Sequence, residues 1–286
     1  MPFSFHSFQP AIRSALNAPA GTSPLIGVCP WVWMSLLILF ACGSSFDLAT
    51  ADDIVKHTPT EPRRPVHLLA VLIGGIESDP TPAQISGTAA RNEGNSGLYR
   101  FADDITVERV IPEYFNWNGT RAGKIRTKDP PGSRGIAEAV RQHLQAFPGD
   151  RIAIVGNSWG GHTALEVTRQ LGEGETPLAV NLVVFLDASS AGRGPARPRA
   201  LPVNVNRAVS YYTRSIVVWG KWDAGKRLEN IDLADPANRF IANGEPPYNA
   251  PFDIRGHVAA EWDEEIHADI QRRLVALLPE QPDQSK

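Results

Sequence analysis

The sequence predicts an α/β fold in which a mostly parallel sheet is covered by helices on both faces. Continuous apolar runs of strand length, such as 66–73 and 180–186, are typical of parallel strands that are buried on both faces. Segments with apolar residues at helical spacing alternate with these runs through short connections, which is the order expected of an α/β sheet. The chain shows no internal repeat and no second domain boundary, so we expect one folded domain over residues 66–280.

The predicted strands follow the apolar runs in chain order. The second of them contains Pro112, which cannot donate to a sheet ladder and makes that strand imperfect. The strands are expected at residues 66–73, 107–115, 151–155, 180–186, 203–213, 215–219 and 229–233.

The predicted helices lie between and after these strands. A short helix is expected at 98–105, a second is capped by Ser133, and a third follows residue 158 and ends near Gly172. A closing helix is expected at 258–278, with the acidic residues of 261–265 on a solvated face. Its apolar stripe has a spacing of four residues and consists of Val258, Trp262, Ile266, Ile270, Leu274 and Leu278.

Composition excludes several classes of function. The 286 residues are 42% hydrophobic and 21% charged, as in an ordinary globular protein, and the net charge of −3 favours neither nucleic acid nor an anionic membrane as the main partner. The only two cysteines, Cys29 and Cys42, precede the expected domain. A cysteine nucleophile, a disulfide framework and a cysteine metal site are therefore excluded from it.

The N-terminal region has the pattern of an export signal. Residues 25–42 are apolar but short for a membrane span, which suits a signal-peptide core. Two processing sites are open: an A-x-A site at residues 49–51, or a sequence similar to a bacterial lipobox in which Cys42 is lipidated. An uncleaved anchor and a later start at Met34 are alternatives. We expect 1–51 to be a signal peptide or a lipoprotein signal or anchor, 52–65 to be a linker, and the protein to be periplasmic, bound to the cell envelope or secreted.

A G-x-S-x-G pentapeptide, Gly156 to Gly160, stands between a predicted strand and a predicted helix. At such a sharp turn the strand and the helix pass closely, so side chains at the two glycines would clash. Ser158 at the apex is the candidate nucleophile. A serine hydroxyl is a poor nucleophile at neutral pH and needs an adjacent base.

Other polar residues and backbone groups follow the predicted strands directly. Residues 74–76 follow the first strand, Asp187 follows the strand 180–186, and His257 is expected in the loop before the closing helix. Because the carboxyl ends of parallel strands share one edge of the sheet, these groups should converge with Ser158. His267 is expected in the middle of a helix, where a histidine is usually structural.

With these features the chain resembles the α/β-hydrolase family over residues 66–278. The resemblance rests on the strand, G-N-S-W-G and helix unit, and on the chain order Ser, Asp, His. The segments GLYRFADDI, YFNWNG and HVAAEWDEEIH look like those of lipase-like or esterase-like exported bacterial hydrolases. Asn157 departs from the family, since many members have histidine before the nucleophile.

The resemblance implies a role for each site residue. Ser158 is the nucleophile, His257 is the base, and the acid is Asp187 or, as the alternative, Asp223. Asp187 is favoured because its strand is the cleaner of the two. The resemblance implies an oxyanion hole formed by the backbone N–H of Trp159 and a second donor at Gly75 or Ile76.

The expected function is hydrolysis of carboxylic esters through an acyl-enzyme, with a small-molecule or lipid ester as the partner. An acyltransferase or thioesterase would use the same residues, and a non-catalytic binding protein at the cell envelope is the alternative of a different class. No P-loop, G-x-G-x-x-G or H-E-x-x-H motif is present, so no cofactor and no metal are expected. Membrane association would come only through the N-terminal segment or a lipidated Cys42. The aromatic residues that could line an acyl pocket, although core packing is their commoner use, are Trp117, Trp159, Trp219, Trp222, Tyr211 and Tyr212.

Overall fold

The computed structural model describes the folded domain and leaves the N-terminal region undescribed. The described residues are 64–76, 78, 80–90, 94–118, 132–189, 200–215, 218, 221–222, 225–238, 248–249, 252 and 254–280. All of them belong to the unit formed by residues 60–286. The expected export segment 1–51 with Cys42, most of the linker 52–65, and Asp223 lie outside the described residues.

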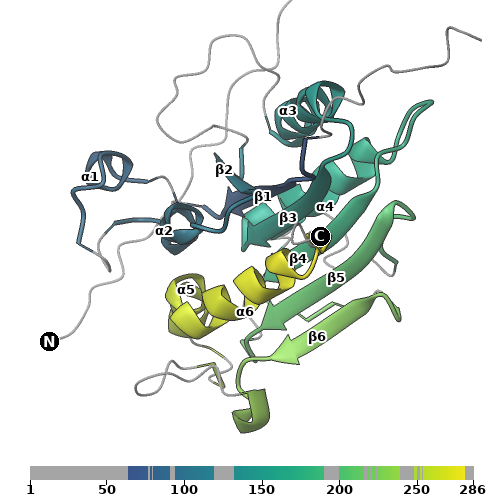
Figure 1. The fold of residues 1–286 in the computed structure, drawn as a ribbon. Helices are drawn as coiled ribbons and strands as arrows, with labels where there is room; N and C mark the ends of the chain where they lie inside the picture. Colours follow the sequence, from purple (N-terminus) through teal and green to yellow (C-terminus); the bar gives the residue numbers. More distant parts are fainter. Residues whose placement is uncertain are drawn as a thin grey trace, which may run out of the picture. The chain divides into compact units, whose positions relative to one another are not determined.

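A sheet of six parallel strands forms the centre of the described domain (Figure 1). The spatial order is β2-β1-β3-β4-β5-β6, and every neighbouring pair is parallel. The strands are β1 (Leu68–Gly74), β2 (Val110–Asn116), β3 (Arg151–Asn157), β4 (Val180–Leu186), β5 (Val205–Tyr212) and β6 (Leu228–Asp232). These strands confirm the predicted parallel sheet. The predicted strand at 215–219 is wrong where it can be checked, because Ser215 and Val218 belong to no strand.

Pro112 lies within β2 in register with Ala70 of β1. β2 is an edge strand with β1 as its neighbour in the sheet. An edge strand needs ladder hydrogen bonds on one side only, so it tolerates a residue that has no N–H. The proline therefore marks the edge of the sheet.

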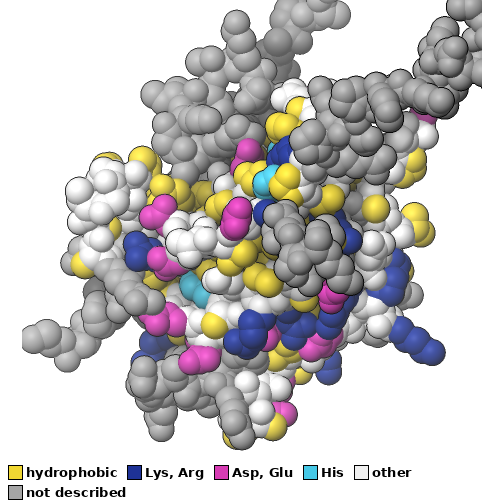
Figure 2. Space-filling model, viewed as in Figure 1, with side chains coloured by type: hydrophobic (Ala, Val, Ile, Leu, Met, Phe, Trp, Pro, Cys, Tyr) yellow, Lys and Arg dark blue, Asp and Glu magenta, His cyan; other side chains and the backbone are white. Residues whose placement is uncertain are grey.

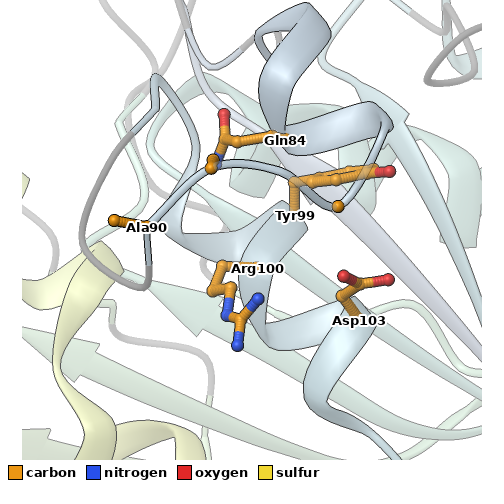
Figure 3. Close-up of a pocket in the computed structure, with 7 residues that line it drawn as sticks. Gln84, Ala90, Tyr99, Arg100 and Asp103 are labelled. Carbon is orange, nitrogen blue, oxygen red and sulfur yellow. The ribbon is translucent and has the colours of Figure 1, made fainter.

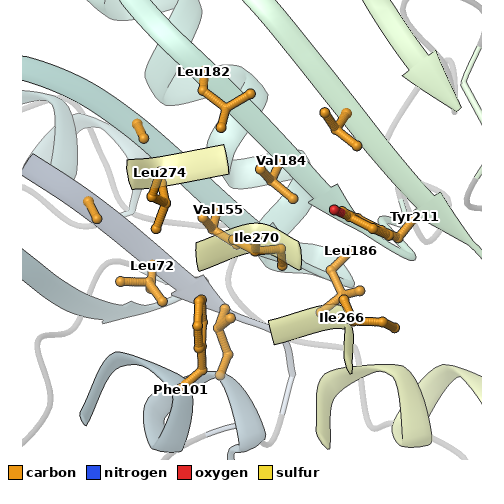
Figure 4. Close-up of a cluster of buried hydrophobic side chains, with 14 of the residues drawn as sticks. Leu72, Phe101, Val155, Leu182, Val184, Leu186, Tyr211, Ile266, Ile270 and Leu274 are labelled. Carbon is orange, nitrogen blue, oxygen red and sulfur yellow. The ribbon is translucent and has the colours of Figure 1, made fainter. Parts of the chain in front are cut away.

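Helices cover both faces of the sheet, as predicted. Alternate residues of β1 enter two different cores: Leu68 and Leu72 pack with α2, α5 and α6, whereas Leu69 and Ile73 pack with α3 and α4. Figure 4 shows the first core, in which the α6 side chains meet those of the central strands. The helices are α1 (Pro82–Ile85), α2 (Gly97–Asp104), α3 (Ser133–Ala146), α4 (Trp159–Leu171), the 3-10 helix η1 (Pro236–Asn238), α5 (Arg255–Trp262) and α6 (Glu264–Val275).

The closing helix differs from its prediction because it is broken in two. Asp263 has an extended backbone and its side chain accepts hydrogen bonds from the N–H groups of Glu265 and Ile266, so it ends α5 and caps α6. Ile266, Ile270 and Leu274 are fully buried as predicted. Val258, by contrast, is 52% exposed, because the new helix start turns it away from the stripe that α6 continues.

Two helix starts also differ from prediction. The cap of α3 is Gly132, without a side-chain hydrogen bond, and the Ser133 hydroxyl instead accepts from Gln170 Nε2 on α4. The segment between β1 and α2, for which no helix is predicted, contains α1, whose start carries a capping box: the Thr81 side chain accepts from the Gln84 N–H, and the Gln84 side chain accepts from the Thr81 N–H.

The face of the molecule in Figure 2 carries basic and acidic side chains interspersed with one another. The described domain also carries an ion-pair network in which Arg273 of α6 binds Asp269 of the same helix and Glu229 of β6. Such interspersed charge is typical of a solvated surface. Within the described residues, no helix combines the length and the apolar character that a membrane crossing requires.

Candidate active site

Ser158 lies on a strained turn between β3 and α4, as the pentapeptide predicts. Its backbone has φ 52° and ψ −122°, a conformation that non-glycine residues rarely adopt. Arg109 and Asp187 are the two other non-glycine residues of the described chain with positive φ. Two of these three residues are thus candidates for the site, which agrees with the tendency of backbone strain to gather where function requires it.

The flanking glycines allow the close packing that holds this turn. A Cβ atom on Gly156 would lie 2.4 Å from the Gly160 carbonyl oxygen, and one on Gly160 would lie 2.1 Å from the Ile73 carbonyl oxygen. Neither distance is compatible with a side chain. The start of α4 therefore rests directly on the end of β1.

Backbone hydrogen bonds join the turn to the end of β4. The Ser158 N–H donates to the Leu186 carbonyl over 3.0 Å, and the Ser158 carbonyl accepts from the Ser189 N–H over 3.0 Å. Asp187 lies between these two partners. The nucleophile candidate and the acid candidate are therefore held on adjoining segments of backbone.

Asp187 is fully buried at the end of β4, where its carboxylate accepts three hydrogen bonds. Oδ1 accepts from the Thr213 N–H at 3.0 Å, and Oδ2 accepts from the Thr213 hydroxyl at 3.0 Å. Oδ2 also lies 2.8 Å from His257 Nδ1. A buried carboxylate without such partners would be very costly, and these bonds fix the orientation of the Asp187 side chain.

His257 lies in the first turn of α5, and the prediction that it lies in a loop before the last helix is wrong. The helix begins at Arg255, because the Val258 N–H already bonds to the Ile254 carbonyl. The position is nevertheless at the expected edge of the sheet, since the imidazole reaches Asp187. A carboxylate oxygen accepts this hydrogen bond, so Nδ1 is the donor and Nε2 is the ring nitrogen left to act as a base.

The predicted oxyanion residues lie beside Ser158. A Cβ atom on Gly75 would be 2.8 Å from Ser158 Cβ and 3.4 Å from Ser158 Oγ, so the loop after β1 passes against the serine side chain. Ile76 follows in a turn and is 44% exposed. Trp159 is the first residue of α4, which places its N–H at the positive end of the helix.

The aromatic residues divide between the site and the core. Trp117, just after β2, packs edge to face on Trp159 with ring centroids 5.2 Å apart. Trp222 instead stacks on Phe185 in the core, and Tyr211 is fully buried. Trp219 lies outside the described residues. The first pair therefore provides an aromatic surface at Trp159, the residue that follows the nucleophile candidate.

Sequence reasoning missed two side chains near the site. Thr213 holds Asp187, and its place directly after β5 was the available signal. Glu261 was expected on a solvated helix face with the other acidic residues of 261–265, but it is only 7% exposed. Its carboxylate accepts from Ser96, Ser78 and the Leu98 N–H.

His267 is structural, as predicted. Its ring stacks on Phe101 with centroids 4.6 Å apart, and Nε2 donates to the Glu261 carbonyl over 2.8 Å. Burial lowers the pKa of His267 to about 4. The ring is thus neutral at neutral pH and provides a fixed donor rather than a base.

Two hollows on the described surface lie away from these residues. The pocket in Figure 3 has a volume of about 10 Å³, room for one water molecule, and is lined by residues of α1, α2 and the segment after α1. A wider groove of about 490 Å³ lies between α3 and α4 and is lined mostly by charged side chains. Among the described residues, no group of three or more His, Cys, Asp and Glu could hold a metal ion.

No family model matches the chain, and its sequence matches no curated protein. Several solved structures are similar in fold at low identity. A yden-like hydrolase from Pectobacterium atrosepticum has a TM-score of 0.41 and 14% identity, covering 74% of this chain and 94% of its own. A serine hydrolase without a lid from Xanthomonas campestris has a TM-score of 0.38 and 14% identity, covering 78% of this chain and 88% of its own.

The catalytic core of an acetyl xylan esterase from Trichoderma reesei has a TM-score of 0.39 and 14% identity, covering 75% of this chain and 99% of its own. The likeness to all three structures is one of fold.

Proposed function

We propose that this protein is a serine hydrolase that cleaves carboxylic esters through an acyl-enzyme on Ser158. The observation that carries the proposal is the 2.8 Å contact between His257 Nδ1 and the buried carboxylate of Asp187, next to a serine on a strained strand-to-helix turn. A serine needs a base, and the base needs a group that orients it and stabilises its charged form. The three residues supply these roles in the chain order Ser, Asp, His.

The proposed reaction begins when His257 Nε2 takes the hydroxyl proton of Ser158 as Oγ bonds to the ester carbonyl carbon. The carbonyl electron pair moves onto oxygen, and the N–H groups of Trp159 and of Gly75 or Ile76 donate to this oxyanion. Collapse of the intermediate breaks the carbon–oxygen bond of the ester, and the alcohol leaves with the proton from the imidazolium. Water then attacks the acyl-enzyme by the same route and restores Ser158.

Asp187 is the acid in this proposal. Its carboxylate bonds to His257, and two hydrogen bonds from Thr213 fix it. Asp223, the alternative, lies outside the described residues. Because Asp187 already bonds to His257, replacing Asp223 with Asn is expected to leave turnover nearly unchanged, whereas Asp187→Asn should remove most of it.

Apolar side chains near the candidate residues favour an ester with an apolar group. Ile76 adjoins Gly75, and Ile254 and Val258 lie on either side of His257 along the chain; all three are substantially exposed. The Trp117 and Trp159 pair adds an aromatic surface beside Ser158. Contact with these groups would remove apolar substrate surface from water, at about 25 cal/mol per Å².

The test is covalent labelling followed by turnover. A fluorophosphonate probe should label the wild-type protein, and Ser158→Ala and His257→Ala should block or strongly slow labelling. A series of p-nitrophenyl esters of increasing chain length, with an acyl-thioester and an added alcohol acceptor beside them, then separates esterase, thioesterase and acyltransferase. A folded wild-type protein that neither takes up the probe nor hydrolyses any ester would contradict the proposal and favour a binding role.

A further inference from the structure

Glu261 is a buried carboxylate that the proposed mechanism does not use. It lies on α5 four residues after His257, which places both side chains on neighbouring turns of one helix face. Oε1 accepts from the Ser96 hydroxyl at 3.0 Å and from the Leu98 N–H at 3.3 Å, and Oε2 accepts from the Ser78 hydroxyl at 3.4 Å. These three groups all donate to the carboxylate.

These donors come from two other segments of the site region. Ser78 belongs to the loop after β1, the loop that also carries Gly75, and Ser96 and Leu98 belong to the start of α2. Tyr114 of β2 strengthens the same junction, since its hydroxyl donates to the Ser78 carbonyl over 2.6 Å and lies 3.0 Å from the Ser96 hydroxyl. Glu261 therefore links the helix of the base to the loop of the expected oxyanion donor.

The segments pack too closely to shift independently. A Cβ atom on Gly97 would lie 2.3 Å from the Glu261 carbonyl oxygen, and one on Gly74 would lie 2.0 Å from the Tyr114 hydroxyl. Interiors packed this tightly transmit a displacement rather than absorb it. A change at Glu261 should therefore reach both His257 and Gly75.

The Glu261 carboxyl also interacts electrostatically with His257. Burial raises the pKa of the Glu261 carboxyl, and the Leu98 N–H, the Ser96 and Ser78 hydroxyls and the charge of His257 oppose that shift. The titratable groups of this region include Tyr114, His267, Tyr248 and Asp187. His267 is neutral at neutral pH because burial lowers its pKa to about 4, and burial raises the pKa of the Tyr248 phenol, so it is neutral as well.

We propose that Glu261 is a positioning residue for the reaction on Ser158: it holds the helix of His257 against the donor loop of Gly75 and adds a second negative charge, besides Asp187, that stabilises the imidazolium. This inference rests on the proposed esterase function. It assigns no contact between Glu261 and the substrate. Its effect is exerted through His257 and through the loop after β1.

The test compares Glu261→Gln with Glu265→Gln, which removes an exposed carboxylate from α6. We expect Glu261→Gln to lower kcat roughly 10-fold to 100-fold with KM within about 3-fold, because orientation of the base is lost while the binding surface stays. The acidic limb of the kcat/KM profile should move to lower pH, since the imidazolium loses a neighbouring negative charge. Glu265→Gln should match the wild type in all three quantities.

A readout that needs no turnover separates this inference from the proposed function. The NMR titration of the His257 ring should have a lower midpoint in Glu261→Gln than in the wild type, whether or not any ester is cleaved. Glu261→Asp, which keeps the charge but shortens the side chain, should lose kcat while its titration stays closer to the wild type. Unchanged kcat and an unchanged His257 titration in folded Glu261→Gln would overturn the inference.

Ser96→Ala provides a second variant if Glu261→Gln does not fold. It removes one of the three donors to the carboxylate. A fall in kcat at nearly constant KM supports the positioning role, and wild-type kcat overturns it. Failure of probe labelling in the wild type, in contrast, would count against the ester hydrolase proposal alone.

Discussion

Two histidine–aspartate pairs lie at opposite ends of β3, and they share nearly the same local chemistry. At the carboxyl end, His257 Nδ1 is 2.8 Å from Asp187 Oδ2; at the amino end, His143 Nε2 is 2.9 Å from Asp150 Oδ2. In both pairs the histidine side chain is 12% exposed and the aspartate is buried. A histidine bound to a buried carboxylate is therefore not by itself a mark of catalysis.

The surroundings of the two pairs differ. Asp150 also accepts from the His67 N–H at 2.9 Å and pairs with Arg64 at 3.4 Å, so it ties the start of β1 to the end of α3. Asp187 is held by Thr213, and its backbone neighbour Leu186 bonds to the strained Ser158. The first environment uses the carboxylate as a structural anchor, and the second places the pair beside a nucleophile candidate at the edge where α/β folds carry their sites.

The largest expected effect separates the two histidines. His257→Ala should lower kcat by roughly 10⁴-fold to 10⁶-fold, because the serine loses its base. His143→Ala should leave kcat within about 3-fold of the wild type. Turnover of a p-nitrophenyl ester, measured on folded protein, checks both variants. Comparable losses of kcat in the two would mean that the pairs do not differ in function.

Substitutions of the two aspartates should affect different quantities: kcat for Asp187 and the free energy of unfolding for Asp150. Asp187→Asn is expected to lower kcat by roughly 10³-fold to 10⁴-fold, since the amide no longer fixes the protonated Nδ1 or stabilises the imidazolium. Asp150→Asn should keep kcat but lower the free energy of unfolding by about 1–3 kcal/mol, because its bonds to His67, His143 and Arg64 are weakened. Chemical denaturation and ester turnover measured side by side check this, and the reverse assignment would break the comparison.

Alanine substitutions of two glycines should also differ in their effect on kcat, by less than the substitutions above. Gly75→Ala would place its methyl group 2.8 Å from Ser158 Cβ, so we expect kcat to fall by about 10²-fold as the serine or the donor loop is displaced. Gly149, beside Asp150, has open space where a Cβ would go. Gly149→Ala should leave kcat unchanged. A fully active Gly75→Ala enzyme would remove the donor loop from the mechanism.

The smallest effect on turnover concerns His267, a buried histidine whose ring nitrogen bonds to a carbonyl instead of a carboxylate. Its folded pKa of about 4 lies below the usual 6.5, so the unfolded chain binds more protons between these values. Its contribution to stability is present above pH 6.5 and is lost as the pH falls toward 4, by up to about 3 kcal/mol.

His267→Gln, which keeps a donor that does not titrate, should reduce this acid sensitivity and leave kcat at neutral pH unchanged. Denaturation curves at pH 4.5 and pH 7 check this prediction. Equal pH dependence in the variant and the wild type would exclude His267 as the cause.

The fold and the main site residues could be predicted from sequence because they depend on local patterns. Apolar runs marked the strands, and the glycines around Ser158 marked a turn that only small residues fit. The position of Asp187 at the edge of the sheet could be predicted because it directly follows the well-defined apolar strand 180–186. The interpretation of Asp223 stays a prediction, since that residue lies outside the described part of the chain.

The features that sequence reasoning missed depend on tertiary contacts or on local capping. Asp263 breaks the closing helix, although the apolar spacing of four runs on through it. The capping box of Thr81 and Gln84 is a local signal for α1, but the surrounding glycine and proline residues are more typical of a loop. Glu261 could not be told from its acidic neighbours, because only the packing of α2 and the loop after β1 decides which carboxylate is buried.

The contacts of Asp187 also have a consequence for the time at which the site can form. Its partners Thr213 and His257 follow it by 26 and 70 residues. Because synthesis proceeds from the N-terminus, a nascent chain that has reached β6 contains Ser158 and Asp187 but not the histidine. Hydrolytic activity should therefore appear only after α5 has left the ribosome, so an incomplete chain would carry the serine without the means to activate it.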